Sequence, residues 1–313
     1  MPTSPRIVFM GTPEFAVASL DAILRAGYNI VAVITAPDKP AGRGMQLTES
    51  AVRKYARSKN LPTLQPEKLK APAFLDELRA FAADLQIVVA FRMLPEVVWN
   101  MPPMGTVNLH GSLLPQYRGA APINWAVING EPETGVTTFK LQQDIDTGNI
   151  LLQEKFPIGP DETAGEVHDR MKEIGAQLLV RTISGLAAGT LTGAPQDNPP
   201  NLRHAPKIFT ETCRIDWTKP IARIYDLIRG LSPFPTAFTE LDGKLLKIYR
   251  AAKDPTPPTL PPGRPDTDQK TYLRFAAADG FIRVTELQLE GKRKMNVADF
   301  LRGYKPPTTT FLE

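Results

Sequence analysis

The sequence predicts an α/β protein in two parts: a Rossmann-like, mainly parallel sheet with helices on both faces, followed by a small OB-like β-barrel. The chain has 313 residues, which is more than one compact domain usually contains. In the first part, apolar strand-like runs alternate with helix-like segments, as they do in parallel sheets. The later apolar runs are short and alternating, which is typical of a small antiparallel barrel.

The first part opens with a strand, a helix and a second strand. Arg6–Met10 is an apolar run, and Thr12 offers an N-cap before Pro13 at the first helical position. We expect the helix to end near Ala26 and the next strand to cover Ile30–Ile34. The further elements expected here are an edge segment at Leu64, a helix at Ala71–Ala83, strands at Leu85–Phe91, Thr106–His110, Val136–Leu141 and Ile150–Phe156, and a helix from a capping box at Thr163 and Glu166 to about Ala188.

The boundary between the two parts is predicted from composition. Residues 190–206 are rich in proline, glycine and asparagine, which is typical of an extended linker. The first domain is therefore expected at residues 1–189 and the second at residues 207–313. The elements expected in the second domain are strands at Lys244–Tyr249, Tyr272–Ala276 and Phe281–Leu289, and a helix at Ile221–Gly230.

Composition excludes several classes of protein. Hydrophobic residues make up 42% of the chain and charged residues 22%, which argues against a disordered chain or a coiled coil. Cys213 is the only cysteine, so that no internal disulfide or cysteine-rich zinc site can form, and a reducing compartment is favoured. No apolar run approaches the length of a signal-peptide core or a membrane span, so we expect a cytoplasmic protein without a membrane partner.

Positive charge is concentrated in the second part. Residues 1–203 contain 19 lysines and arginines against 20 acidic residues, whereas residues 204–313 contain 18 against 13. A basic module joined to a near-neutral one indicates a polyanionic partner, because phosphates attract lysine and arginine over about one Debye length. Solubility alone is the alternative explanation, and the charge balance does not choose between the two.

Two polar residues of a predicted strand form the first candidate for chemistry. Asn108 and His110 are two positions apart, so their side chains point to one face while Val107 and Leu109 point to the other. They precede a glycine-containing loop at the carboxyl end of the strand, where open α/β sheets usually bind their ligands. A core histidine satisfied by hydrogen bonds is the alternative.

A polar turn with two carboxylates follows at Gln143–Gly148. Asp144 and Asp146 there match the pattern Asp-x-Asp-x-Gly, which commonly makes an Asx turn or a weak cation site. Together with Asn108 and His110, however, a carboxylate completes what acyl transfer to an amine requires. These requirements are a donor for the developing oxyanion and a group that handles a proton.

Several ordered motifs resemble the folate-dependent formyltransferases. They are Asn108-x-His110, Ser112–Pro115, Arg118–Ile123 and Asp144-x-Asp146-Thr-Gly148. Phe9–Phe15, Pro37–Gly44, Asp216–Trp217 and Ile228–Pro235 are similar to the members of that family that formylate methionyl-tRNA. The resemblance, which runs nearly end to end, implies transfer of a formyl group from 10-formyltetrahydrofolate to the methionine of initiator Met-tRNA.

The resemblance also implies roles for individual residues. Asn108 and His110 would stabilise the oxyanion, and Asp146 would orient His110 and accept the proton of the amine through a water, so that the three form a catalytic trio. The residues expected to contact folate are Ser112, Leu113, Leu114 and Pro115, together with Asp144 and the backbone near Phe91, Arg92 and Leu94. The run Phe91–Pro95 departs from the longer, glycine-rich run that is common in the family.

Basic residues in two places are expected to contact tRNA. Arg43, in the loop Pro37–Met45, is the candidate for a phosphate or terminal-nucleotide contact. The candidates in the second domain are Lys207, Lys292, Arg293 and Lys294. A mobile surface loop and a solvated hairpin are the respective alternatives, although OB-like barrels commonly bind nucleic acid.

Two other functions share most of these features. The first is a formyltransferase that acts on an amino-sugar nucleotide or on glycinamide ribonucleotide, which the basic second domain disfavours. The second is an RNA- or folate-binding protein without catalysis, which Asn108, His110 and Asp146 disfavour. No nucleotide-cofactor motif is present, and no histidine has the spacing of a metal ligand, so we expect no metal. The expected oligomeric state is a monomer.

Overall fold

The computed structural model describes residues 4–41 and 46–305, and the chain packs into two units. Unit 1 comprises Met1–Gly119, Glu133–Phe156 and His168–His204, and unit 2 comprises Ala120–Pro132, Pro157–Val167 and Ala205–Glu313. This grouping differs from the predicted boundaries at residues 189 and 207. Two segments that we expected in the first domain, residues 120–132 and 157–167, pack with the second unit instead.

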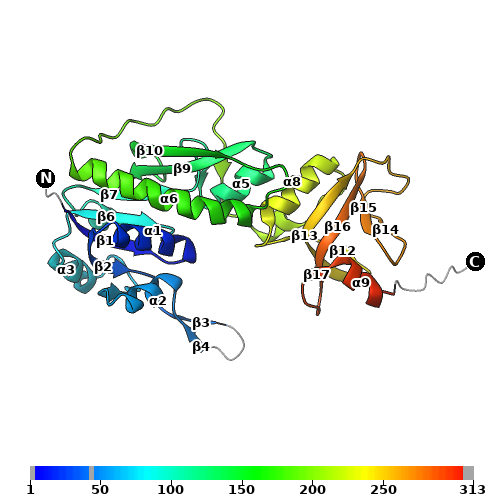
Figure 1. Cartoon of the computed structure of the whole chain (residues 1–313), viewed down its shortest axis with the longest axis horizontal. Coiled ribbons are helices and arrows are strands. Elements are labelled where there is room, and N and C mark those ends of the chain that lie inside the picture. Colours follow the sequence, from blue (N-terminus) through cyan, green and yellow to red (C-terminus); the bar gives the residue numbers. More distant parts are fainter. Residues whose placement is uncertain (1–3, 42–45, 306–313) are drawn as a thin grey trace, which may run out of the picture. The chain divides into compact units, whose positions relative to one another are not determined.

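A seven-stranded sheet forms the centre of unit 1. Its strands are β1 (Arg6–Gly11), β2 (Asn29–Ile34), β5 (Thr63–Leu64), β6 (Leu85–Val89), β7 (Thr106–His110), β9 (Glu133–Lys140) and β10 (Ile150–Pro157). They follow the order β10-β9-β7-β6-β1-β2-β5, and β10 to β2 can be followed from top to bottom in Figure 1. The pairs of β1 with β2 and β6, of β2 with β5 and of β6 with β7 are parallel, while β7 and β9 are antiparallel. The prediction of a mainly parallel sheet is confirmed.

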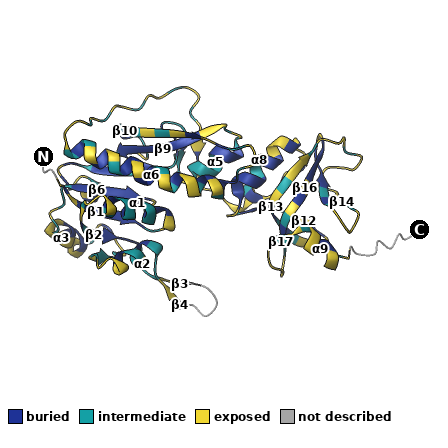
Figure 2. Ribbon diagram, viewed as in Figure 1, coloured by how far each residue is buried: buried dark blue, intermediate teal, exposed yellow. Residues whose placement is uncertain are grey.

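Helices cover both faces of this sheet, as predicted. The helices of the region are α1 (Glu14–Arg25), α2 (Ala51–Ser58), α3 (Pro72–Ala80), α4 (Glu96–Trp99) and α6 (Ala164–Ala187). Residues of α3 and α4 share one buried cluster with Val8 and Val88 of the sheet. On the other face, a Cβ atom at Gly175 of α6 would lie 2.8 Å from the side chain of Leu109, so this glycine permits close packing. Figure 2 shows buried strands between helices whose outer surfaces are exposed.

The limits of several elements differ from the expected ones. Thr12 is not the N-cap of α1; Pro13 holds that position in an extended conformation, without a side-chain cap, and the helix begins at Glu14. Left-handed backbone at Ala82, with φ 44°, follows α3, and the same conformation at Ala90, with φ 47°, follows β6. Both elements therefore end earlier than their apolar patterns predict, because regular structure cannot continue through positive φ.

Some elements escaped the sequence analysis because their apolar patterns are short. Helix α2 has only two buried residues, although Ser50 caps it by accepting a hydrogen bond from the backbone of Arg53 at 3.0 Å. Two short ladders were also not expected: β3 (Lys39–Ala41) with β4 (Gln46–Thr48), and β8 (Arg118–Gly119) with β11 (His204–Ala205). The segment predicted as a loop from Pro37 to Met45 is therefore partly a β-hairpin stem.

Unit 2 is built on an antiparallel sheet. Its strands are β12 (Ala237–Leu241), β13 (Lys244–Asp254), β14 (Pro265–Thr267), β15 (Leu273–Ala276), β16 (Phe281–Leu289) and β17 (Met295–Asn296), and its helices are α5 (Pro122–Ile128), α7 (Thr210–Cys213), α8 (Ile221–Leu231) and α9 (Val297–Gly303). The order is β12-β13-β16-β15-β14, with β17 also on β16. The register shifts around Arg250, and such irregularities bend strands. The OB-like prediction is confirmed in the form of a half-barrel.

Side-chain contacts explain why residues 157–167 belong to unit 2. Arg229 of α8 is 7% exposed, and its guanidinium donates to the carbonyl of Glu162 at 3.1 Å and pairs with Asp226 at 2.7 Å. The hydroxyl of Tyr225 donates to Asp161 at 2.6 Å, and burial together with this carboxylate raises the pKa of Tyr225 to about 12. Glu162 and Asp161 are more than 60 positions from Arg229 and Tyr225, so composition alone gave no sign of the grouping.

The predicted capping box at the start of α6 is present. The Thr163 hydroxyl accepts from the backbone of Glu166 at 3.3 Å, and the Glu166 carboxylate accepts from the backbone of Thr163 at 2.8 Å. Among the helices of the described residues, none combines the length and the apolar character that crossing a membrane requires.

Candidate functional site

The candidate site begins with the two polar residues at the carboxyl end of β7. Asn108 lies in register with Val88 of β6 and Phe139 of β9, and His110 lies in register with Thr137 of β9. His110 is buried, whereas Asn108 is half buried. The Asn108 amide has no hydrogen-bond partner among the residues that the structure describes, so it can bind a ligand without breaking an existing contact.

Both nitrogens of the His110 ring face polar partners. Nε2 lies 2.9 Å from the carbonyl oxygen of Tyr117. Because a carbonyl can only accept, Nε2 must carry the proton, and Nδ1 of the neutral ring then has a free lone pair. Nδ1 lies 3.8 Å from Oδ2 of Asp146, which is too far for a hydrogen bond but close enough to stabilise a positively charged ring. The arrangement suits a ring that accepts a proton at Nδ1.

Asp146 is held in place by its own backbone conformation and by a neighbouring loop. Its φ of 54° lies in the left-handed region, which aspartate tolerates better than most residues. Its Oδ2 accepts a hydrogen bond from the backbone of Gly119 at 3.0 Å. Gly148 closes the turn: a Cβ atom there would lie 1.7 Å from the carbonyl oxygen of Lys140, so only glycine fits. The structure thus places the Asp146 carboxylate opposite His110, and Asn108 lies two residues before His110 on the same strand. The joint catalytic role of the three stays a prediction.

Asp144 lies apart from this cluster. Its side chain is exposed, and its carbonyl accepts a hydrogen bond from the Thr147 hydroxyl at 3.1 Å, as in a tight turn. Within residues 4–41 and 46–305, no group of three or more histidines, cysteines and carboxylates is arranged to hold a metal ion. The contact of Asp144 with folate stays a prediction.

The loop Ser112–Pro115 is fixed mainly by internal contacts. Ser112 is fully buried, and its hydroxyl donates to the carbonyl of Gln116 at 2.6 Å. Thr137 donates to the carbonyl of Ser112 at 2.7 Å and accepts from the backbone of Leu114 at 3.1 Å. Leu114 is also buried, so Leu113 and Pro115 are the members of the loop with accessible side chains. These hydrogen bonds explain the shape of the loop. Its contact with folate stays a prediction.

A pocket opens beside the loop that follows β6. It has a volume of about 460 Å³ and is lined by Thr12, Ala36, Pro37, Lys39, Glu67, Phe91 and Arg92. Thr12, Ala36 and Phe91 follow β1, β2 and β6, so the pocket lies at the carboxyl edge of the sheet, where α/β folds bind ligands. Arg92 donates to the carbonyl of Glu67 at 2.8 Å, whereas Leu94 is buried in the cluster under α3 and α4. Of the three predicted folate contacts in this loop, two line a pocket.

Comparison with known proteins decides the family. The family described as "Formyl transferase" matches residues 5–183, and "Formyl transferase, C-terminal domain" matches residues 207–305. The chain belongs to the formyl transferase family. A relative from Parabacteroides distasonis, named methionyl-tRNA formyltransferase, is 58% identical over an alignment of 310 positions that covers 96% of each chain. A relative of the same name from Bacteroides fragilis is 53% identical over 96% of this chain and 95% of its own.

Solved structures share the fold of this formyl transferase. WlaRD, a sugar 3N-formyl transferase, matches 92% of this chain and 99% of its own with a TM-score of 0.67 at 21% identity. HypX from Aquifex aeolicus, in complex with tetrahydrofolic acid, matches 96% of this chain and 48% of its own with a TM-score of 0.64 at 18% identity. At these identities the likeness concerns the fold alone.

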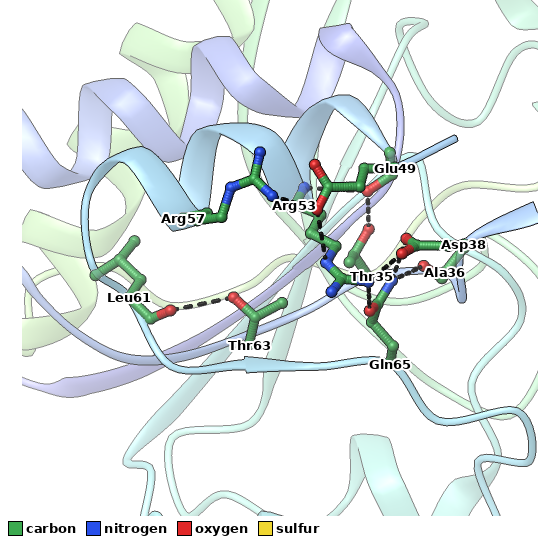
Figure 3. Close-up of polar contacts among 10 residues, drawn as sticks. Thr35, Ala36, Asp38, Glu49, Arg53, Arg57, Leu61, Thr63 and Gln65 are labelled. Carbon is green, nitrogen blue, oxygen red and sulfur yellow. Dashed lines mark hydrogen bonds and ion pairs between the residues drawn. The ribbon is translucent and has the colours of Figure 1, made fainter. Parts of the chain in front are cut away.

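A salt-bridged cluster supports the hairpin of β3 and β4 in this formyl transferase (Figure 3). Asp38 precedes β3 and Glu49 follows β4. Arg53 of α2 contacts both, pairing with Asp38 and lying 3.3 Å from Glu49, and it also binds Gln65. One guanidinium thus joins the two ends of the stem. Arg43, the predicted tRNA contact, lies outside the described residues.

The predicted basic residues of unit 2 do not share one environment. Lys294 pairs with Glu286 at 2.7 Å and lies over the ring of Tyr249 at 4.7 Å, so part of its charge is already compensated. Lys292 and Arg293 are exposed in the turn between β16 and β17, and neither has an ion pair within the described part of the chain. Lys207 is exposed as well, and its ammonium lies 5.5 Å from the centre of the Phe209 ring. Their contact with tRNA stays a prediction.

Four residues around the trio were missed by the sequence analysis. Tyr117 and Gly119 bind His110 and Asp146 through backbone groups, which no side-chain pattern reveals. Arg118 was visible in the Arg118–Ile123 motif but received no role. Gln196 lies in the tract that we predicted as a linker, and nothing in its sequence context marked it.

Proposed function

We propose that this formyl transferase transfers the formyl group of 10-formyltetrahydrofolate to the α-amino group of methionine on initiator tRNA. The observation that carries the proposal is the relative named methionyl-tRNA formyltransferase, which is 58% identical along 96% of both chains. An identity of this size extends over both units, including the basic stretch of residues 204–313 that a small acceptor would not require. The site geometry supports the chemistry that the name describes.

The proposed reaction makes one bond to the formyl carbon and breaks another. The neutral amine of methionine attacks the formyl carbon, and a tetrahedral oxyanion forms. The half-buried amide of Asn108 donates to this oxygen, and loss of one such donor costs on the order of a hundredfold in rate. The bond between the carbon and N10 of the folate then breaks, which leaves formylmethionine on the tRNA and tetrahydrofolate as the second product.

The proton follows a path set by His110. Nδ1 takes the proton that the attacking amine loses, because Nε2 is already bound to the Tyr117 carbonyl. The carboxylate of Asp146, 3.8 Å away, stabilises the ring while it is charged. The ring then returns the proton to N10 of the leaving folate, so His110 is neutral again at the end of the cycle.

Folate and tRNA are assigned to different surfaces. Phe91 and Arg92 follow β6 and the loop Ser112–Pro115 follows β7, and these residues are proposed to hold the folate. The proposed tRNA contacts are Arg43, Lys207, Lys292 and Arg293. Lysine and arginine side chains suit phosphates, whose contacts set position and not sequence preference.

A competition between acceptors tests the proposal. The purified chain is incubated with 10-formyltetrahydrofolate and with charged initiator Met-tRNA, elongator Met-tRNA, an amino-sugar nucleotide or glycinamide ribonucleotide, and each product is weighed by mass spectrometry. Formylated initiator Met-tRNA is the expected product. Formylation of a small acceptor alone would reject the proposal, and the absence of turnover on every acceptor would favour a protein that only binds.

A further inference from the structure

The proline-rich tract after α6 contains one side chain, that of Gln196, whose hydrogen-bond donors and acceptor all have partners. Residues 195, 197 and 198 are exposed, but Gln196 between them is half buried. Its Nε2 donates to the carbonyls of Asp146 and Gly148, both at 2.8 Å. Its Oε1 accepts from Nη2 of Arg118 at 2.7 Å and from Nε at 3.1 Å. A surface glutamine whose donors and acceptor are all engaged has a defined orientation.

The tract is fixed to unit 1 on both sides of Gln196. Before it, Ala194 and Ile150 exchange two backbone hydrogen bonds, at 2.8 and 2.9 Å. After it, the carbonyl of Arg203 accepts from the backbone of Tyr117 at 2.6 Å. Tyr117 is the residue whose carbonyl binds His110. A segment with the composition of a linker therefore contacts the residues that hold His110 and Asp146 in place.

The conformation that Gln196 holds is an unfavourable one. Asp146 has a φ of 54°, in the left-handed region, which aspartate enters more readily than most residues but which is still sparsely populated for any residue other than glycine. The Asp146 carboxylate is fixed by Gly119 at 3.0 Å, and its backbone is fixed by Gln196. The guanidinium of Arg118, the residue before Gly119, is tied to the same glutamine. One amide thus joins the two loops that meet at Asp146.

We propose that Gln196 is a positioning residue for formyl transfer, which keeps the Asp146 carboxylate facing His110. The inference rests on the proposed function in that it takes Asp146 as catalytic. Gln196 does not touch His110 and has no part in the proton transfer. It acts by holding the turn, and displacement of a catalytic group by about 1 Å can cost on the order of a hundredfold in rate.

Two substitutions separate the contacts of Gln196. Gln196→Glu keeps an oxygen for Arg118 but places a carboxylate against the two carbonyls, whereas Gln196→Met removes every hydrogen bond at similar size. We expect kcat to fall about 10- to 100-fold in both variants, with KM for tRNA and for folate within about twofold of wild type. Gln177→Glu is the control for the added charge, because it makes the same change at an exposed residue of α6.

A double-mutant cycle tests whether the effect passes through Asp146. In an Asp146→Asn background, Gln196→Met should lower kcat by less than about twofold further, because the group that it positions has already lost its charge. Multiplicative losses would overturn the proposal, and so would wild-type kcat in Gln196→Glu. A crystal structure of Gln196→Met supports it if φ of Asp146 leaves the left-handed region, and contradicts it if residues 144–148 are unchanged.

Failure of the proposed function has a different signature. A wild-type chain that formylates another acceptor would refute the assignment to Met-tRNA. The ratio of variant to wild-type kcat, measured on whichever acceptor reacts, would still report on Gln196. The crystal structure reports on the turn without any activity.

Discussion

The imidazole of His110 faces the carboxylate of Asp146 across 3.8 Å, while the opposite nitrogen of the ring is bound to the backbone at 2.9 Å. The two residues are 36 positions apart and come from the end of β7 and from the turn after β9. Because one nitrogen is committed to a carbonyl, the other is the one available for proton transfer. The two nitrogens of the ring therefore have different roles, and each role can be tested by its own substitution.

Two replacements of His110 distinguish the role of Nε2 from that of Nδ1. Glutamine carries an amide N–H near the position of Nε2, so His110→Gln should keep the bond to the Tyr117 carbonyl while losing the proton acceptor. We expect kcat to fall about 100-fold or more, with a melting temperature close to that of wild type. His110→Ala should lose the same activity and also melt lower, because it leaves a buried carbonyl unpaired. Equal melting temperatures would contradict the anchoring role of Nε2.

The charge of Asp146 can be removed with little change in shape. Asp146→Asn keeps an oxygen for the backbone of Gly119 and tolerates the left-handed conformation. We expect kcat to fall about 100-fold or more while KM for folate stays within about threefold, because the charged ring loses its partner. Steady-state kinetics with initiator Met-tRNA check this. Retention of half the wild-type kcat would show that the carboxylate charge is not needed.

Residue 148 must be glycine because the backbone of Lys140 leaves no room for a side chain there. Gly148→Ala would place a methyl group 1.7 Å from the carbonyl oxygen of Lys140, so the turn that carries Asp146 must shift. We expect destabilisation by about 1–3 kcal/mol in urea unfolding, together with loss of activity. Gly303→Ala is the control, because its Cβ meets no atom within 4 Å. A neutral Gly148→Ala would contradict the packing at this turn.

Arg53 should control the hairpin stem. Arg53→Met removes the contacts with Asp38, Glu49 and Gln65, whereas Arg57→Met removes only an exposed pair with Glu49. Hydrogen exchange of the β3 and β4 amides should be about tenfold faster in Arg53→Met and nearly unchanged in Arg57→Met. Equal protection in wild type and Arg53→Met would show that the stem does not depend on this guanidinium.

Glu166 makes part of the stability of α6 depend on pH. Burial alone would raise the pKa of its carboxyl, but the Thr163 hydrogen bonds and the Arg250 guanidinium bring the pKa below its ordinary value of 4.5. A lowered folded pKa means that the stabilisation is complete above about pH 4.5 and is lost as the pH falls through the folded value.

Glu166→Gln checks this dependence, because glutamine keeps the capping box and loses the charge. The wild type should be more stable than the variant by up to about 1 kcal/mol at pH 7, a small value because the pair with Arg250 is half exposed. The difference should shrink as the pH falls below about 4.5. A difference in melting temperature that does not change between pH 7 and pH 3 would assign the effect to packing.

Periodicity predicted the fold where apolar patterns are long. The strands at the centre of unit 1 and the capped helix from Thr163 were predicted nearly to their ends, because burial on both faces or along one stripe selects such patterns. Short elements such as α2 and the ladder of β3 with β4 were missed, since few of their residues are buried. The ends of α3 and β6 depend on left-handed residues, alanines in both cases, which carry no turn signal.

Alternation in β7 places Asn108 and His110 on one face whatever surrounds them, so the amino-acid pattern is enough to identify these groups as available for chemistry. How they are used depends on contacts that form only in the folded chain. Three hydrogen bonds depend on backbone atoms. His110 Nε2 binds the carbonyl of Tyr117, the Asp146 carboxylate accepts from the backbone of Gly119, and the Gln196 amide donates to the carbonyl of Asp146. Every residue has the same backbone atoms, so the sequence contains no local signal for these bonds, and only folding selects which of them form.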